Sequence, residues 1–179
     1  MTQARSDITT RARQAYRPSK VRVLMIAESP PASNGFFYFP KTIGKDHLFR
    51  ETMKALGLWP EDKRMEKNVD KRLMLQQFQS MGIYLLDASS YPVNRFSRAR
   101  RRKAVLNQLP RLLNEVMSVD PNSIIIVKAS IFHPVNNALT ESGFGPRILN
   151  GGPLAFPSHG NQQKYRSMMK KMLGKAHLL

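Results

Sequence analysis

The sequence predicts an α/β fold, a three-layer α/β/α sandwich around a central, mainly parallel four-stranded sheet. Short apolar runs rich in β-branched residues are typical of buried strands. They occur at residues 21–26, 83–86 and 124–127, with one or two further short strands at 148–149 and 154–156. Segments with helical spacing separate these runs. Strands that alternate with helices form a parallel sheet that is covered on both faces.

Six segments have the spacing of helices. They are residues 3–16, 46–57, 69–80, 98–118, 131–141 and 160–174. Pro110 is expected to kink or split the fourth of these, because proline lacks an N–H group and clashes with the preceding turn. Right-handed crossovers place the carboxyl ends of parallel strands at one edge of the sheet. We therefore expect Glu28, Asp87, Lys128 and the segment 157–159 to gather along that edge.

The charge of the chain indicates a nucleic-acid partner. Its 179 residues include 29 Lys and Arg but 12 Asp and Glu, a net charge of +17. Such an excess usually neutralises phosphates, and its clustering favours this interpretation over a merely solvated surface. An anionic membrane surface is the weaker alternative, since no predicted helix combines a large apolar face with basic flanks. We expect DNA as the partner, with RNA as a second class, and no membrane.

Composition also restricts the cellular location, the domain organisation and the possible cofactors of the protein. The apolar runs are far too short to cross a bilayer, and residues 1–20 lack the apolar core of a secretory signal. We expect these residues to form a basic N-terminal arm, followed by one domain over 21–179. The sequence has no cysteine, which excludes disulfides and thiolate-bound metals or clusters. We therefore expect a cytoplasmic monomer (nucleoid-associated in a prokaryote) with no cofactor and no metal.

Glu28 is the first candidate site residue. It directly follows the strand 21–26, and ligands in open α/β sheets bind beyond the carboxyl ends of strands. A carboxylate there can act as a general base or stabilise a developing cation; equally, it can cap the next element or pair with an arginine.

Phe36 and Phe37 begin a run of four aromatic residues. We expect at least one of the four to be exposed and able to stack on a base, and two of them to cover the core.

Three later segments supply further candidates. Asp87 directly follows the strand 83–86 and can either contact an amino group on a base edge or cap the following turn. The densest basic run lies at the start of the helix 98–118, where cations oppose the helix macrodipole; this cost favours phosphate binding over a solvated face. Small residues over 151–162 let a backbone approach a phosphate closely. His159 in this turn is either a ligand or merely exposed.

In their order along the chain, these segments resemble the motifs of the uracil-DNA glycosylase superfamily. Ala27-Glu28-Ser29-Pro30-Pro31 resembles its Gly-Glu-Ala-Pro-Gly turn, and Phe36 or Phe37 falls where that family has the aromatic that stacks on the extruded base. Leu85-Leu86-Asp87 is similar to the strand whose last residue contacts uracil. Pro92-x-Asn94-Arg95 resembles the Pro-x-Asn-Arg of the iron–sulfur subgroup, and Phe156-Pro157-Ser158 the second motif, His-Pro-Ser. The resemblance extends from Val21 to Leu173.

The sequence departs from this family at three points. Phe156 replaces the histidine that stabilises the leaving base, so this role passes to His159 or is absent. Asp87 replaces an asparagine; an ionised aspartate only accepts hydrogen bonds and would face uracil O4 unfavourably. An amino-bearing base is therefore chemically more compatible with this site. The cluster-ligating cysteines are missing, so no cluster is expected.

The resemblance implies a DNA glycosylase-like hydrolase of base excision repair. It would flip a damaged or deaminated base, uracil or a related one, out of DNA and hydrolyse its N-glycosidic bond. Glu28 and His159 would be catalytic, and Phe36, Phe37 and Asp87 would bind the base. The residues expected to hold the DNA strand are Ser29, Pro30, Asn94, Arg95, Arg98, Arg100, Arg101, Arg102, Pro157, Ser158, Lys164 and Arg166. The alternatives are a non-catalytic DNA- or RNA-binding module on the same fold and a ribosome- or RNA-associated protein.

Overall fold

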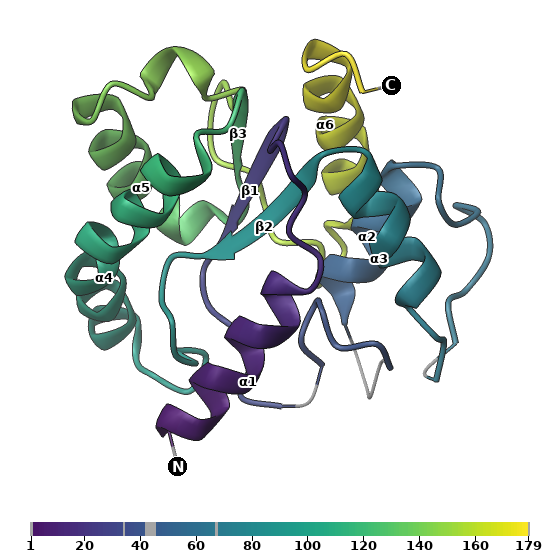
Figure 1. The fold of residues 1–179 in the computed structure, drawn as a ribbon, viewed down its shortest axis with the longest axis horizontal. Coiled ribbons are helices and arrows are strands. Elements are labelled where there is room, and N and C mark those ends of the chain that lie inside the picture. Colours follow the sequence, from purple (N-terminus) through teal and green to yellow (C-terminus); the bar gives the residue numbers. More distant parts are fainter. Residues whose placement is uncertain (1, 34, 42–45, 67, 179) are drawn as a thin grey trace.

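A parallel sheet of three strands forms the centre of the molecule (Figure 1). The computed structural model describes residues 2–33, 35–41, 46–66 and 68–178, with side chains from residue 7 onward. The strands are β1 (Val23–Ala27), β2 (Ile83–Asp87) and β3 (Ser123–Ile126), in the order β2-β1-β3. Both neighbours run parallel to β1. The predicted α/β class and the positions of these strands are confirmed.

The prediction of a fourth strand is wrong. Ile148 and Leu154 each form an isolated parallel bridge, to Ile124 and Val127 respectively, but the residues between them leave the sheet. They include two glycines and a proline, which weaken a strand or lack the N–H that a ladder needs. The side chain of Asn150 forms the hydrogen bonds to β3 that the backbone of a fourth strand would have formed. Its Oδ1 accepts from the N–H of Ile126 at 2.7 Å, and its Nδ2 donates to the carbonyl of Ile126 at 3.0 Å.

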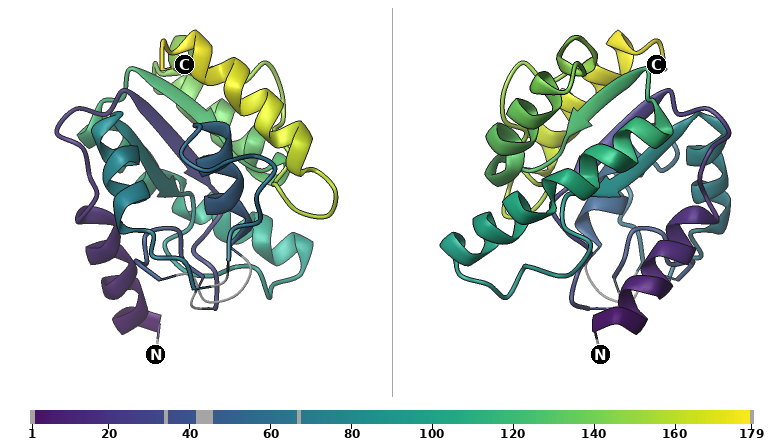
Figure 2. Two further views of the ribbon diagram at one scale, coloured as in Figure 1. Left: turned by 90° about the vertical axis from the view of Figure 1, so that its right-hand side faces the viewer. Right: turned by 60° about the vertical axis from the view of Figure 1, so that its left-hand side comes forward.

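The helices form one layer on each face of the sheet, as Figures 1 and 2 show. One layer contains α2 (His47–Ala55), α3 (Arg72–Ser80) and α6 (Gln162–Lys175), and the other contains α4 (Arg98–Val119) and α5 (Ala129–Glu141). A short 3-10 helix, η1 (Gly145–Arg147), follows α5. No helix in the described part of the chain is long and apolar enough to cross a membrane.

Pro110 does not split α4, which continues as one helix to Val119. The proline lies on the exposed side, whereas Leu112 and Val116 are fully buried. Burial of side chains of this size stabilises the fold by about 1.5–3 kcal/mol each. Together they offset the cost of about 3 kcal/mol that an interior proline imposes on a helix. Tertiary packing therefore holds together a helix that local sequence disfavours.

The N-terminal helix α1 (Thr2–Gln14) packs beside β2 and α4 (Figure 1). Just after it, the ring of Tyr16 stacks on that of Tyr38, with centroids 6.1 Å apart and planes at 14°. Arg17 donates to the carbonyl of Ser118 at the end of α4, and its own carbonyl accepts from Gln79 of α3. The predicted basic arm is thus attached to both helical layers. It also lies against an edge strand, which proteins commonly protect from other chains.

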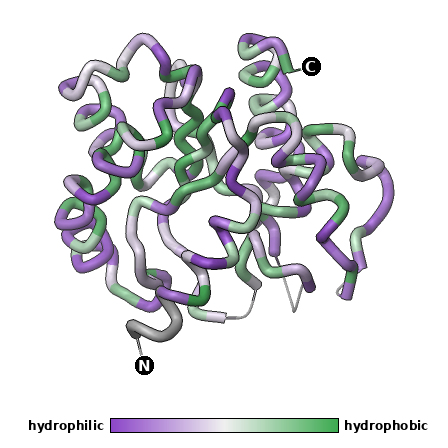
Figure 3. The backbone as a smooth tube through the Cα atoms, viewed as in Figure 1, coloured by the Kyte–Doolittle hydropathy of each residue, from purple (hydrophilic) through white to green (hydrophobic). Residues whose placement is uncertain are grey.

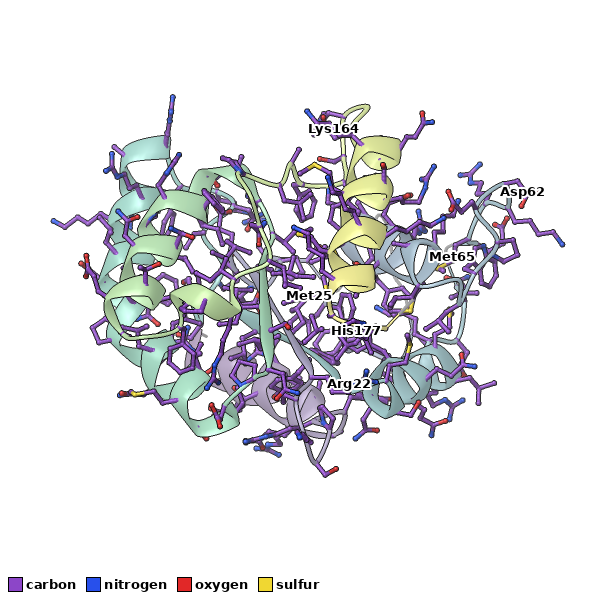
Figure 4. All side chains as sticks on the ribbon, turned by 90° about the horizontal axis from the view of Figure 1, so that it is seen from above. Arg22, Met25, Asp62, Met65, Lys164 and His177 are labelled. Carbon is purple, nitrogen blue, oxygen red and sulfur yellow. The ribbon has the colours of Figure 1, made fainter. Side chains whose placement is uncertain are left out.

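The core follows the sheet. All residues of β1 and β2 are buried, as expected for strands covered on both faces. Figure 3 shows these strands as an apolar centre. In Figure 4, Met25 of β1 lies in the interior, and Lys164 and Asp62 lie at the periphery.

Lys71 and Asp46 form an ion pair inside the protein. Lys71 is fully buried, and its Nζ donates to Asp46 Oδ2 at 2.8 Å and to the carbonyl of Phe36 at 3.0 Å. Asp46 also caps α2 by accepting from the N–H of Phe49. Burial lowers the pKa of Lys71, and the charge of Asp46 opposes this shift. The pair ties the aromatic loop around Phe36 to the start of α2.

Replacing Lys71 by methionine is expected to lower the free energy of unfolding by about 3–5 kcal/mol, because Asp46 becomes an unpaired buried charge. The double variant Lys71→Met/Asp46→Asn keeps an N-cap acceptor and buries no charge, so it should recover part of this loss. Urea unfolding of the wild type, both single variants and the double variant measures the coupling. Strictly additive losses would contradict a direct interaction.

Candidate functional site

The chain leaves β1 and β3 toward opposite faces of the sheet. The helices α2 and α3 follow β1 on one face, and α5 follows β3 on the other. Open α/β sheets bind ligands in the crevice beyond the strand ends at such a reversal. Glu28 is the first residue after β1, and Lys128 lies two residues after the end of β3. These two side chains therefore face the point where a ligand site is expected.

A pocket of about 220 Å³ opens at this point. It lies below the range of about 300–1,000 Å³ that is typical of drug-sized ligands, so it suits a single ring system. The structure brings many of the predicted site residues together here. Those that line the pocket are Glu28, Ser29, Pro30, Phe36, Phe37, Asp87 and Asn94.

Glu28 is buried and held on several sides. Its Oε2 forms an ion pair with Lys128 Nζ and lies 4.0 Å from Arg101 Nη1, and its Oε1 accepts from Ser130 Oγ at 3.0 Å. Its backbone carbonyl accepts from the N–H of Ser89 at 2.9 Å, which extends the pairing of β1 with β2 past the strand end. A buried carboxylate is tolerated when it is paired and hydrogen-bonded. These contacts fix the orientation of the carboxylate within the pocket.

Lys128 has a strained backbone. Its φ is +93°, in a region that side chains other than glycine rarely adopt. Its N–H donates to the carbonyl of Leu154 at 3.0 Å, and its Nζ contacts Glu28 and lies 5.7 Å from the centre of the Phe156 ring. Strain of this kind persists where surrounding contacts enforce it and is concentrated at functional sites. Here it accompanies a lysine that lines the pocket.

Asp87 lines the same pocket and pairs with Arg13 of α1. Arg13 Nη2 donates to Asp87 Oδ2 at 2.6 Å, and the two side chains are 10% and 4% exposed. Burial raises the pKa of Asp87, and the charge of Arg13 opposes that shift. Arg111 of α4 donates to the backbone carbonyls of Asp87 and Ala88 at 2.8 and 2.9 Å. The N-terminal helix thus supplies the countercharge for a carboxylate of the pocket.

The aromatic loop contributes mainly to the core. Phe36 and Phe37 are 1% and 4% exposed, and Phe37 meets the edges of Phe49 and Tyr38 at centroid distances of 5.3 and 5.2 Å. Little of either ring is accessible to a ligand. Phe156, which is half-buried, has the most exposed of the described aromatic rings that line the pocket.

The arginines at the start of α4 lie next to the pocket. Arg101 donates to the carbonyl of Asn94, which lines the pocket, at 3.0 Å, and Ser97 caps the helix. The guanidinium of Arg100 lies over the ring of Phe96, 4.3 Å from its centroid. No carboxylate in the described part of the chain forms an ion pair with four exposed arginines of this run. They are Arg95, Arg98, Arg100 and Arg102.

The second predicted turn does not bring its polar side chains to the pocket. Pro157 is buried, and Ser158 Oγ lies 2.9 Å from Nδ1 of His159, which is exposed and has a φ of +52°. Lys164 is exposed on α6 (Figure 4). Arg166 pairs with Glu51 and Glu61, so its guanidinium joins α6 to α2.

Sequence reasoning missed the roles of Lys128, Ser130 and Arg13. Lys128 was expected at the correct edge of the sheet. Its pairing with Glu28 could have been predicted from the sequence, because the two residues have opposite charges and follow two neighbouring strands. Arg13 and Asp87 lie 74 residues apart, and no local pattern connects them. Among the residues that the structure describes, no group of three potential ligands could hold a metal ion.

No protein-family model matches this chain, and a search of curated proteins also finds no match. The function therefore has to be argued from the pocket and its surroundings.

Replacing Arg13 by methionine is expected to raise the pKa of Asp87 further, because burial is then opposed only by the more weakly acting charge of Arg111. A carboxyl group whose pKa is higher in the folded state loses stabilisation as pH rises through the interval between the two values. The stability deficit of the variant should therefore widen as pH rises above the ordinary aspartate pKa of about 4. NMR titration and urea unfolding measure the two effects, with Arg11→Met as the exposed control. A deficit that is independent of pH would mean that Arg13 acts by packing alone.

Proposed function

We propose that this chain binds DNA and hydrolyses the N-glycosidic bond of a base flipped into the pocket between β1 and β3. One observation carries the proposal: a small pocket with a buried, oriented carboxylate adjoins exposed arginines that have no carboxylate partner in the described structure. The carboxylate supplies chemistry and the arginines supply phosphate contacts. Their proximity favours a nucleic acid over a free small molecule.

The size of the pocket supports a flipped base. A volume of about 220 Å³ admits one ring system but not a stacked pair, so a base has to leave the duplex to enter it. The exposed arginines at the start of α4 would hold the phosphates that flank this base. Arg100 is already positioned by its contact with the ring of Phe96.

Glu28 supports a hydrolytic reaction. Cleavage of a glycosidic bond passes through a transition state with positive charge on the sugar, which a nearby carboxylate stabilises. The same carboxylate can accept a proton from the attacking water. Lys128 and Ser130 hold Glu28 in one orientation. Lys128 also places a cation in the pocket, where it can stabilise negative charge on the leaving base in place of the family's histidine.

Asp87 supports a preference for an amino-bearing base. Asp87 is one of the residues that line the pocket, and its countercharge comes from Arg13. An ionised carboxylate accepts hydrogen bonds and does not donate them. A base that presents an exocyclic amine toward Asp87 is therefore favoured over uracil, which presents O4.

Glu28→Gln is expected to slow base release by about 10²–10³-fold, the usual effect of removing one electrostatic stabiliser, and to leave DNA affinity within a few-fold. Single-turnover assays on oligonucleotides with uracil, hypoxanthine, xanthine or 3-methyladenine measure release, and Glu141→Gln on the exposed end of α5 is the control. If the wild type binds DNA but leaves every substrate intact, the chain is a binding module and the enzymatic proposal fails.

Arg98→Ala/Arg100→Ala/Arg102→Ala is expected to weaken binding and to reduce the slope of log K against log salt by about 0.9 for each lost phosphate contact on duplex DNA. Fluorescence anisotropy over a salt series measures both. The matched control is Lys63→Ala/Arg64→Ala/Lys171→Ala, which removes the same charge elsewhere. An equal effect of the control would show that only net charge matters, and equal affinity for structured RNA would favour an RNA-associated protein.

A further inference from the structure

Lys128 is the only lysine among the described residues that line the pocket. Its side chain is 26% exposed and its Nζ contacts Oε2 of Glu28, which is itself 4% exposed. The amine is therefore reachable from the pocket and lies directly beside the carboxylate that would face the sugar. We propose that Lys128 gives this site a second activity: it forms a Schiff base with the aldehyde of an abasic sugar in DNA and cleaves the strand as a lyase. The inference rests on the proposed function only in taking DNA as the ligand.

The need to neutralise the charge of Glu28 does not by itself explain why residue 128 is a lysine. The guanidinium of Arg101 already approaches the same oxygen, at 4.0 Å, and arginine is the usual residue for a buried ion pair. The backbone of Lys128 also has a φ of +93°, a strained conformation of the kind that is concentrated at functional sites. A primary amine beside a carboxylate that can accept its proton is the arrangement that carbonyl chemistry uses, because lysine amines form Schiff bases with carbonyl substrates.

The reaction balances without a cofactor. Glu28 accepts a proton from the ammonium, and the Nζ lone pair attacks C1′ of the open-chain sugar. The attacking amine passes a proton to the former carbonyl oxygen, and Glu28 returns the proton that it accepted, so that this oxygen leaves as water. A protonated C=N bond now joins Lys128 to the sugar, and Glu28 is a carboxylate again. A proton then leaves C2′ to the carboxylate, the electrons form a C2′=C3′ bond, and the C3′–O bond breaks so that the downstream strand departs with its phosphate. Water finally hydrolyses the imine, which restores the lysine and releases an unsaturated aldehyde.

The substrate class follows from the same geometry. An abasic sugar is the product of base release, and its C1′ lies where the bond to the base has just been broken. The sugar equilibrates between a closed hemiacetal and a free aldehyde, and only the aldehyde can react with an amine. Glu28, which would stabilise positive charge on this carbon during hydrolysis, lies in contact with the nucleophile.

The test is reductive trapping on DNA with a preformed abasic site. Full-length protein is incubated with this oligonucleotide and sodium cyanoborohydride, which reduces an imine to a stable amine. We expect a covalent protein–DNA adduct, and peptide mass spectrometry is expected to locate the sugar on Lys128. Without the reductant, we expect strand cleavage on the 3′ side of the abasic site.

Variants separate chemistry from folding and charge. Lys128→Arg keeps a cation beside Glu28 and is expected to reduce adduct yield to background, while affinity for abasic DNA stays within a few-fold. Lys128→Met is expected to do the same with weaker binding. Lys20→Arg, an exposed position before β1 at the opposite end of the sheet, is the matched control and should trap like the wild type. Because the adduct is mapped in the wild type, the test does not depend on the folding of any variant.

The outcomes distinguish the two proposals. Absence of an adduct, or an adduct on another residue, overturns the lyase. If base-containing oligonucleotides are then still hydrolysed, the hydrolase proposal stands alone. If the adduct forms on Lys128 but no base is released from any substrate, the proposed hydrolase fails and the chain acts on abasic DNA that another reaction produces.

Discussion

The ion pair between Glu28 and Lys128 connects the ends of β1 and β3, and both residues line the pocket. The chain turns toward opposite faces of the sheet after these strands, so no continuous helix or strand joins the two sides of the crevice. Each partner is held through its backbone, Glu28 by Ser89 and Lys128 by Leu154. The attraction between their side chains then bridges the crevice, while the strained backbone of Lys128 shows that the surrounding contacts outweigh a local conformational cost.

Pairing of opposite charges also determines how charge is distributed in the rest of the protein. Inside the protein, carboxylates are paired across long distances in sequence: Asp87 with Arg13, Asp46 with Lys71, and Glu51 with Arg166. These pairs satisfy buried charges, which are costly when they are unpaired. With 29 Lys and Arg against 12 Asp and Glu, most cations have no acid to pair with. A cluster of them projects from the start of α4 beside the pocket, where a polyanion can supply the missing countercharge.

Much of the fold was predictable because it follows from local pattern. The apolar runs around Met25, Leu85 and Ile125 predicted three buried strands, and all three are present. The errors arose where tertiary contacts replace a local rule. The amide of Asn150 takes over the hydrogen bonds that a fourth strand would have made, and packing of Leu112 and Val116 keeps α4 continuous through Pro110. The candidate site was predictable to the extent that parallel strands end at one edge, which placed Glu28, Asp87 and Lys128 together.

The sequence by itself determined the α/β class, the helices and strands that carry the site, and the edge of the sheet at which the site lies, because these depend on periodicity and on the handedness of the connections. The tertiary structure alone decided which charges meet. Hydropathy places a side chain inside or outside but does not identify its partner, so the contact of Lys128 with Glu28 and the reach of Arg13 to Asp87 emerge only when the chain is folded. For the same reason, Phe36 and Phe37 turned out to be packed mainly into the core, and His159 lies outside the pocket. The chemistry of the site is set by these long-range pairings.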